Sequence, residues 1–113
     1  MAQFFLRPEL HNHDSGDYEQ LHNELAAAGY YRVVRLDNNI WHDLPTGEYH
    51  KYSTNLIDTE KTVIEAAILQ VVNNNRLRTK DYWYVLTNSD ASEVKLKLKR
   101  TTDQAKLPPG EWL

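Results

Sequence analysis

The sequence contains no cysteine, and it has no run of apolar residues long enough to span a membrane. The first absence excludes disulfides, thiolate metal sites and cysteine nucleophiles. The first residues, MAQFFLRPEL, also lack the basic region and apolar core that mark a signal peptide. We therefore expect a cytoplasmic protein that does not associate with membranes.

The length of the chain favours one domain. A chain of 113 residues buries about two-thirds of the surface that its unfolded form exposes, so it needs no disulfide or metal to stabilise its core. We predict a single domain over residues 1–100. Residues 101–113 lack hydrophobic periodicity, contain Pro108, Pro109 and Gly110, and are expected to form a tail.

Charge is distributed unevenly along the chain. Residues 1–75 hold five Lys and Arg against eleven Asp and Glu, a net charge of −6, whereas the rest of the chain holds eight against five, a net charge of +3. Arg76, Arg78 and Lys80 precede a predicted strand and are candidate RNA contacts. Lysines also alternate along the segment 94–98, where they form either a solvated, edge-protecting face or a phosphate contact surface.

Hydrophobic spacing predicts the secondary structure. Period-two alternation predicts strands, and apolar residues three and four positions apart predict helices. The predicted strands are 4–10, 30–36, 48–53, 82–87 and 94–98, with an extended segment at 40–44. The predicted helices are 17–28, with Asp17 as its N-cap and Gly29 as its stop, and a second that starts at Asp58 or Thr59 and ends at the asparagines 73–75.

This order predicts an α+β, ferredoxin-like βαββαβ fold. Two helices would cover one face of an antiparallel sheet, and an extra C-terminal strand would follow. A small sheet has unprotected edges, which the extra strand could cover or use to pair with another chain. We therefore expect a homodimer.

Three short motifs resemble the small antitoxins of type V toxin–antitoxin systems, the GhoS-like family, whose fold is similar to that of the CRISPR-associated Cas2 proteins. The similarity extends over about residues 3–87. It rests on Arg7, Glu9, Leu10 and His11; on Asp17, Tyr18, Leu21 and His22; and on Leu44, Pro45, Thr46, Gly47, Glu48 and Tyr49. The resemblance implies an endoribonuclease that cuts a toxin's messenger RNA.

The end of the first strand carries the candidate catalytic residues. Metal-independent RNA cleavage requires a base, an acid and a cation that stabilises the phosphate. Histidine suits the first two roles because it titrates near neutral pH, and arginine suits the third. The candidates are Arg7, Glu9, His11, His13 and Asp14.

Two other interpretations of this cluster stay open. His11, His13, Asp14 and Glu9 could hold a divalent metal, although an H-x-H pair without a distant third ligand is a weak signal and we predict no cofactor. Alternatively, Asp14 and its neighbours only cap the following helix, or the histidines are simply exposed.

Aromatic residues supply a second group of candidates. Trp41 and His42 are predicted to assist RNA binding, with packing as the alternative for Trp41, whereas Tyr49 is expected to pack in the core. In the strand 82–87, one face must be buried, so either Trp83 or its two tyrosine neighbours can meet a ligand.

His22 and His50 are expected on the surface. The main alternative to RNA cleavage is a non-catalytic module that binds a protein partner or a second copy through a sheet edge.

Overall fold

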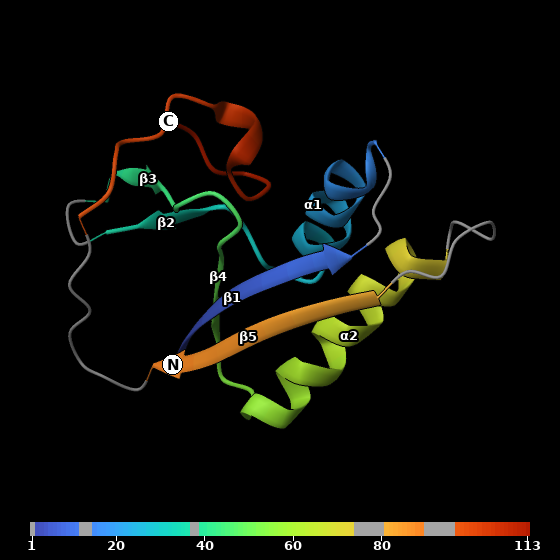
Figure 1. Ribbon diagram of the computed structural model, residues 1–113. Helices are drawn as coiled ribbons and strands as arrows, with labels where there is room; N and C mark the ends of the chain where they lie inside the picture. The colour runs from blue at the N-terminus through green and yellow to red at the C-terminus, as the bar shows by residue number, and fades with distance from the viewer. Residues whose placement is uncertain (1, 12–14, 37–38, 74–80, 90–96) are drawn as a thin grey trace.

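The computed structural model describes residues 2–11, 15–36, 39–73, 81–89 and 97–113. It is a small α+β fold with two helices and two antiparallel sheets (Figure 1). The elements, in chain order, are β1 (Ala2–His11), α1 (Asp17–Ala27), β2 (Val33–Arg35), β3 (Trp41–Asp43), β4 (Tyr49–Ser53), α2 (Ile57–Asn73), β5 (Asp81–Ser89) and a 3-10 helix (Gln104–Lys106).

The first strand is the centre of a three-stranded sheet with the order β4-β1-β5. Both neighbours are antiparallel to it, and Phe5 lies opposite His50 on one side and Thr87 on the other. Buried residues alternate with more exposed ones along β1, as the sequence pattern predicts for a strand with one covered face.

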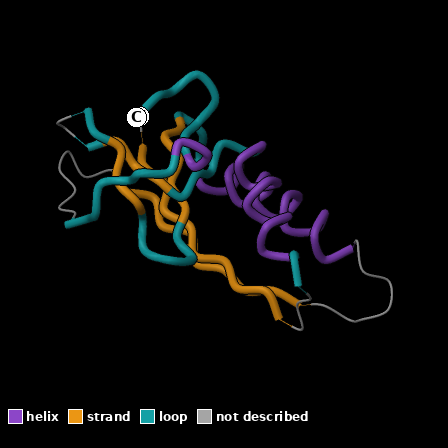
Figure 2. Tube along the Cα trace, turned by 90° about the horizontal axis from the view of Figure 1, so that it is seen from above, coloured by secondary structure: helices purple, strands orange, loops and turns teal. Residues whose placement is uncertain are grey.

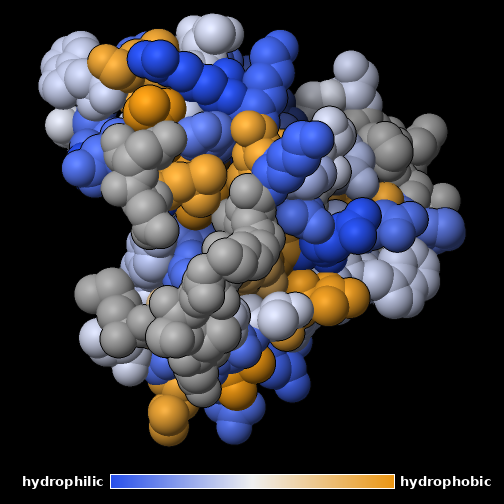
Figure 3. Space-filling model, turned by 90° about the vertical axis from the view of Figure 1, so that its left-hand side faces the viewer, coloured by the Kyte–Doolittle hydropathy of each residue, from blue (hydrophilic) through white to orange (hydrophobic). Residues whose placement is uncertain are grey.

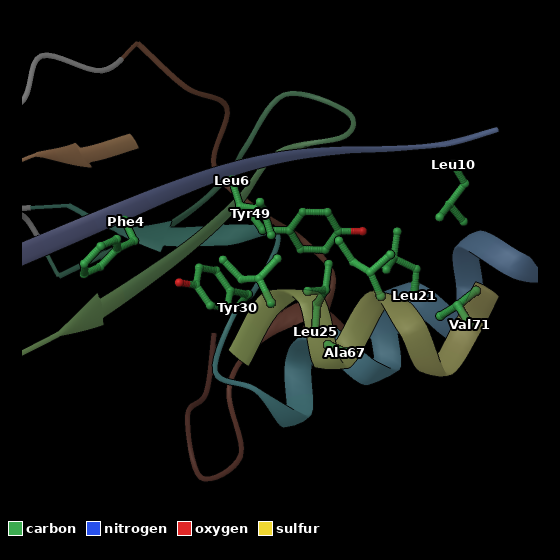
Figure 4. Packing of buried hydrophobic residues seen from close by; sticks show 11 residues of the cluster. Phe4, Leu6, Leu10, Leu21, Leu25, Tyr30, Tyr49, Ala67 and Val71 are labelled. Atoms are coloured by element: carbon green, nitrogen blue, oxygen red, sulfur yellow. The ribbon is translucent and has the colours of Figure 1, made fainter. Parts of the chain in front are cut away.

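Both helices lie on the same side of the strands (Figure 2). They cover the sheet face from which Phe4, Leu6 and Leu10 project, and Figure 4 shows these side chains directed toward the helices. The remaining members of the buried cluster are Leu21, Leu25, Tyr30, Tyr49, Ile64, Ala67, Ile68 and Val71. The apolar stripe of α2 recurs at steps of three and four residues, which explains why a single helix face contributes four of them.

The helix boundaries differ slightly from the prediction. Gly16, with φ 90°, is the N-cap of α1, and Asp17 is its first residue. In the second helix, the backbone N–H groups of Thr59 and Glu60 donate to the carbonyl of Leu56, so α2 begins one residue before Asp58. The predicted stop at Gly29 is confirmed: its φ of 91° is a conformation that glycine adopts without steric cost.

The predicted strand 30–36 divides between two partners. Tyr31 exchanges two backbone hydrogen bonds with His50, at 2.8 and 3.0 Å, next to β4. Beyond it, β2 pairs with β3 and with no other strand of the described chain. β3 is formed from the predicted extended segment. Three strands therefore lie between the helices, where the predicted order has two.

The C-terminal segment 97–113 lies against the small sheet. The Asp43 N–H donates to the carbonyl of Lys99 at 2.8 Å, and the Thr101 N–H donates to the carbonyl of Trp41 at 3.0 Å. Leu107 is buried, so the segment expected to be a tail packs against the domain. The predicted strand 94–98 lies mostly outside the described residues, and its described part has no strand structure.

Neither described helix is long and apolar enough to cross a membrane.

Candidate nucleic-acid interface

The side of the large sheet that faces away from the helices exposes several side chains, although His50 on it is buried. We call it the open sheet face, and it comprises Phe5, Arg7, Glu9 and His11 of β1, Tyr52 of β4, and Trp83 and Val85 of β5. Trp83 is 52% exposed, Val85 63% and Tyr52 48%. Such exposure is high for large apolar and aromatic side chains in a strand, because these usually pack in the core.

Within strand 82–87, Trp83 is the exposed side chain and its two tyrosine neighbours are partly buried. Tyr82 and Tyr84 are partly buried and pack against the core cluster on the helix side. The Tyr84 hydroxyl donates to Glu65 Oε1 at 2.8 Å. Burial and this carboxylate raise the pKa of Tyr84 to about 12, so the phenol stays protonated and holds β5 against α2.

A groove of about 470 Å³ runs along the open sheet face. Its lining residues are Arg7, Pro8, Glu9, Gly47, Trp83, Tyr84 and Val85. The groove is therefore bordered by one cation, one carboxylate and an exposed indole. The turn that contains Gly47 is closed by a hydrogen bond from the Glu48 N–H to the Pro45 carbonyl at 3.0 Å.

Three predicted catalytic residues share this face. His11 contacts the Trp83 ring edge-on, with ring centroids 4.9 Å apart. Arg7 Nε lies 3.5 Å from Glu48 Oε1, and the Arg7 side chain is 69% exposed. An ion pair this exposed contributes little to stability, so an incoming phosphate can replace Glu48 as the partner of Arg7.

Five further residues that were predicted to be catalytic or to bind RNA lie outside the described residues: His13, Asp14, Arg76, Arg78 and Lys80. The pairing of His11 with His13 thus stays a prediction. Among the residues that the structure does describe, no three His, Asp or Glu side chains are grouped as a metal site would require.

Trp41 and His42 occupy the small sheet, so they are not in strands that pair with β1. The guanidinium of Arg35 lies 5.4 Å from the centre of the Trp41 ring. His42 Nδ1 is 2.9 Å from the Ile40 carbonyl oxygen. Both side chains are half-buried, and both have local partners.

Asp43, the next residue, is also paired. A hydrogen bond from Thr101 and the ammonium group of Lys106 hold the pKa of its carboxyl below the ordinary value. The side chain therefore ties β3 to the C-terminal segment.

The prediction that His50 is a surface residue is wrong. His50 is only 4% exposed and lies between the rings of Phe5 and Tyr52, at centroid distances of 5.0 and 4.6 Å. His50 lies opposite Phe5 and so shares its sheet face, but Tyr31, Val33, Trp41 and Pro108 line the same cavity as His50. Residues distant in the sequence therefore cover this end of the face, which alternation along β4 cannot predict. Burial lowers the pKa of His50 to about 4, and its Nε2 lies 3.0 Å from Gln3 Oε1.

His22 was likewise expected on the surface, but it is half-buried. Its Nδ1 forms a hydrogen bond with the hydroxyl of Tyr49. Burial, together with the charges of Arg32 and Lys106, lowers the pKa of His22. Tyr49 itself is in the core, as predicted.

Sequence reasoning missed the buried carboxylate of Glu60. Its Oε1 accepts hydrogen bonds from the Tyr30 hydroxyl and the Lys51 ammonium group, both at 2.9 Å. Its Oε2 accepts from Ser53 at 2.6 Å and from Asn55 at 2.9 Å. Burial by itself raises the pKa of Glu60, but these four hydrogen bonds outweigh it and hold the pKa at about 2.

One signal in the sequence could have revealed this position. Glu60 lies four residues before Ile64 and eight before Ile68, in phase with the apolar stripe of α2. A carboxylate in phase with a buried stripe requires partners, because an unpaired buried charge is strongly destabilising.

In the view of Figure 3, the coloured hydrophobic residues form several separate patches between hydrophilic ones.

Comparison of this chain with protein-family models, with curated proteins and with solved structures found no match.

Proposed function

We propose that this protein binds single-stranded RNA on its open sheet face. The observation that carries the proposal is the exposure of Trp83 and Tyr52 on the face that no helix covers. Proteins recognise unpaired bases by stacking them on aromatic side chains, and this stacking tolerates any sequence because every base has a π-face.

The polar residues of the open sheet face complement the aromatic ones. Arg7 supplies a fork of donors that suits a phosphate group, and it lies on the same groove as Trp83. The net charge of −3 favours binding through a few local contacts over binding through a general basic surface.

The proposal includes a ferredoxin-like arrangement of the strands. The central position of β1 between β4 and β5 supports it, as does the bridge between Tyr31 and His50, which places the start of the β2 segment beside β4. In this interpretation β3 is an insertion between the second and third strands of the fold.

We extend the proposal to antitoxin-like RNA cleavage in the cytoplasm. His11 is exposed at the end of β1 and contacts Trp83, which would bring a stacked nucleotide near an imidazole. His11 and His13 would act as acid and base, and Arg7 would stabilise the charge on the phosphate.

Binding is tested by fluorescence anisotropy with a labelled, unstructured RNA. Trp83→Ala is expected to weaken affinity by about 1–3 kcal/mol, the usual contribution of one base stacked on an aromatic ring. Trp112→Ala is the matched control, because Trp112 is 78% exposed and lies outside the open sheet face. Equal loss in both variants, or no RNA binding by the wild type, would overturn the proposal.

Cleavage is tested separately, on a long unstructured RNA with and without EDTA. Discrete products that persist in EDTA and disappear in His11→Ala support metal-independent acid–base chemistry. Loss of products with EDTA would assign the cleavage to a metal site. Intact RNA that is still bound would leave a binding protein without nuclease activity.

The edge of β5 favours a second candidate function. In the described sheet β5 has a partner on one side only, over nine residues. A long edge strand can pair with a second copy or with an extended peptide. Sedimentation equilibrium over a range of concentrations would reveal a dimer, whereas a monomer at every concentration would contradict pairing between copies.

A further inference from the structure

A second cavity lies between α1 and the C-terminal segment, away from the open sheet face. Its volume is about 290 Å³. His22 of α1 lines it together with Arg32, Tyr49, Lys106 and Leu107. Three parts of the chain that are far apart in the sequence therefore border it, namely α1 with the residues that follow it, β4 and the C-terminal segment. Such a concave site between elements is typical of pockets for small molecules.

Positive charge dominates the cavity. Its lining contains Arg32 and Lys106 and, among the described residues, neither Asp nor Glu. Lys106 Nζ lies 3.3 Å from Asp43 Oδ1, so its charge is partly neutralised. Arg32 is half-buried, and no carboxylate among the described residues forms an ion pair with it.

The charge of Arg32 is effective inside the cavity. Burial is the main reason why the pKa of His22 is lowered, and the Arg32 guanidinium adds to that effect while Glu19 opposes it. The same guanidinium counteracts the effect of burial on the pKa of Tyr49. Arg32 therefore contributes positive potential at His22 and at Tyr49, two of the polar side chains that line the cavity.

We propose that this cavity binds a small organic anion, whose phosphate or carboxylate group contacts the guanidinium of Arg32. A half-buried guanidinium that has no carboxylate partner in the described part of the chain gains charge-assisted hydrogen bonds from such a group. Ala26, Ala27 and Leu107 line the same cavity and would contact the apolar part of the ligand. The volume is at the lower end of the range for ligand pockets, which restricts the ligand to about one aromatic ring and its acidic group.

The test is a two-dimensional NMR titration of the full chain with phenyl phosphate and, separately, with benzoate. We expect saturable shifts at His22 and Tyr49. Arg32→Gln is expected to weaken the binding by about tenfold or more, because hydrogen bonds to charged groups are the strong ones. Preference for one probe would identify the acidic group that the cavity recognises.

Arg35→Gln is the matched control. Arg35 is three residues away and exposed, and its Nη1 lies 3.8 Å from Glu111 Oε2. The Arg35→Gln variant should bind both probes with the affinity of the wild type. Arg32→Lys keeps the charge and is expected to retain partial binding. This variant separates the loss of the charge from a loss of folding in Arg32→Gln.

Three results would overturn the proposal: no saturable binding by the wild type, equal binding by Arg32→Gln, or equally tight binding of uncharged phenol. RNA affinity should be the same in Arg32→Gln as in the wild type. Failure of the anion site and failure of the RNA-binding surface are therefore distinguishable.

Discussion

Individual polar side chains in this protein depend on partners supplied by other elements. Glu60 is fully buried, yet it remains ionised because four donors from three different segments converge on it. One of them, Lys51, is itself mostly buried and would lose its counter-ion without Glu60. Removing one partner of such a buried ion pair is strongly destabilising, because the other charge stays buried without a counter-ion.

Glu60→Gln is expected to lower the free energy of unfolding by about 2–4 kcal/mol, because it leaves Lys51 unpaired and weakens three further hydrogen bonds. Urea denaturation measures the change. Glu19→Gln, at an exposed position of α1, should change stability by less than about 0.5 kcal/mol. Similar small effects in both variants would show that the network around Glu60 contributes little.

His50 makes stability depend on pH. Its pKa is about 4 in the folded protein, against an ordinary value of 6.5, so the unfolded chain binds the proton more tightly between these values. Stability from this residue is complete above pH 6.5 and is lost as the pH falls toward 4. The loss between pH 7 and pH 5 is on the order of 2 kcal/mol.

Denaturation at a series of pH values checks this prediction. His50→Gln should flatten the decline between pH 7 and pH 5. Glu60 acts in the same direction but at lower pH. Because its pKa is lowered from 4.5 to about 2, its contribution is present above pH 4.5 and is lost as the pH falls toward 2.

At the scale of elements, the C-terminal segment stabilises the small sheet. The two-stranded pair of β2 and β3 is short, and an isolated hairpin of this size is marginal in water. Hydrogen bonds from Asp43 and Thr101 connect β3 to the segment, and Leu107 is only 7% exposed. The C-terminal segment thus supplies the small sheet with the backbone hydrogen bonds of a third strand and with an apolar side chain that packs near it.

Leu107→Ala is expected to destabilise the protein by about 2–5 kcal/mol, the usual range for truncating a buried leucine. Leu113→Ala is the control, because Leu113 belongs to the same segment but is 54% exposed. Thermal unfolding followed by circular dichroism compares the two. If Leu107→Ala unfolds at the wild-type temperature, the segment contributes little to stability.

At the scale of the whole molecule, the buried residues divide into two groups. The main cluster joins the large sheet to both helices, and Figure 4 shows its side chains meeting between them. Val33, Val34, Leu44 and Leu107 are also buried but lie outside that cluster, near the small sheet. Tyr30 and the Tyr31–His50 bridge connect the two groups.

We expect the two groups to unfold together, because a domain of this size usually unfolds in one cooperative step. Tryptophan fluorescence, which reports on Trp41 in β3, Trp83 in β5 and Trp112 in the C-terminal segment, should give the same transition as far-UV circular dichroism. An earlier change in fluorescence that Trp83→Phe does not abolish would indicate that the small sheet unfolds independently.

The α+β class and most of the elements could be predicted from local pattern. Alternation along β1 and the stripe of α2 are periodic over many residues, and each period has one physical cause, a single covered face. Alternation along β5 likewise predicted that either Trp83 or its two tyrosine neighbours would lie on the exposed face, without deciding between them. Gly29 ended α1 as predicted because glycine alone adopts its φ without cost.

Other properties were decided only by contacts between distant segments. The sequence by itself determined the strand that carries Arg7, Glu9 and His11, and the face on which they alternate. The tertiary structure decided that His50 is buried, that Glu60 has four partners, that residues 97–113 pack against β3, and that Arg32 lines a cavity. Local spacing cannot predict these features, because burial and charge pairing depend on which segments become neighbours after folding.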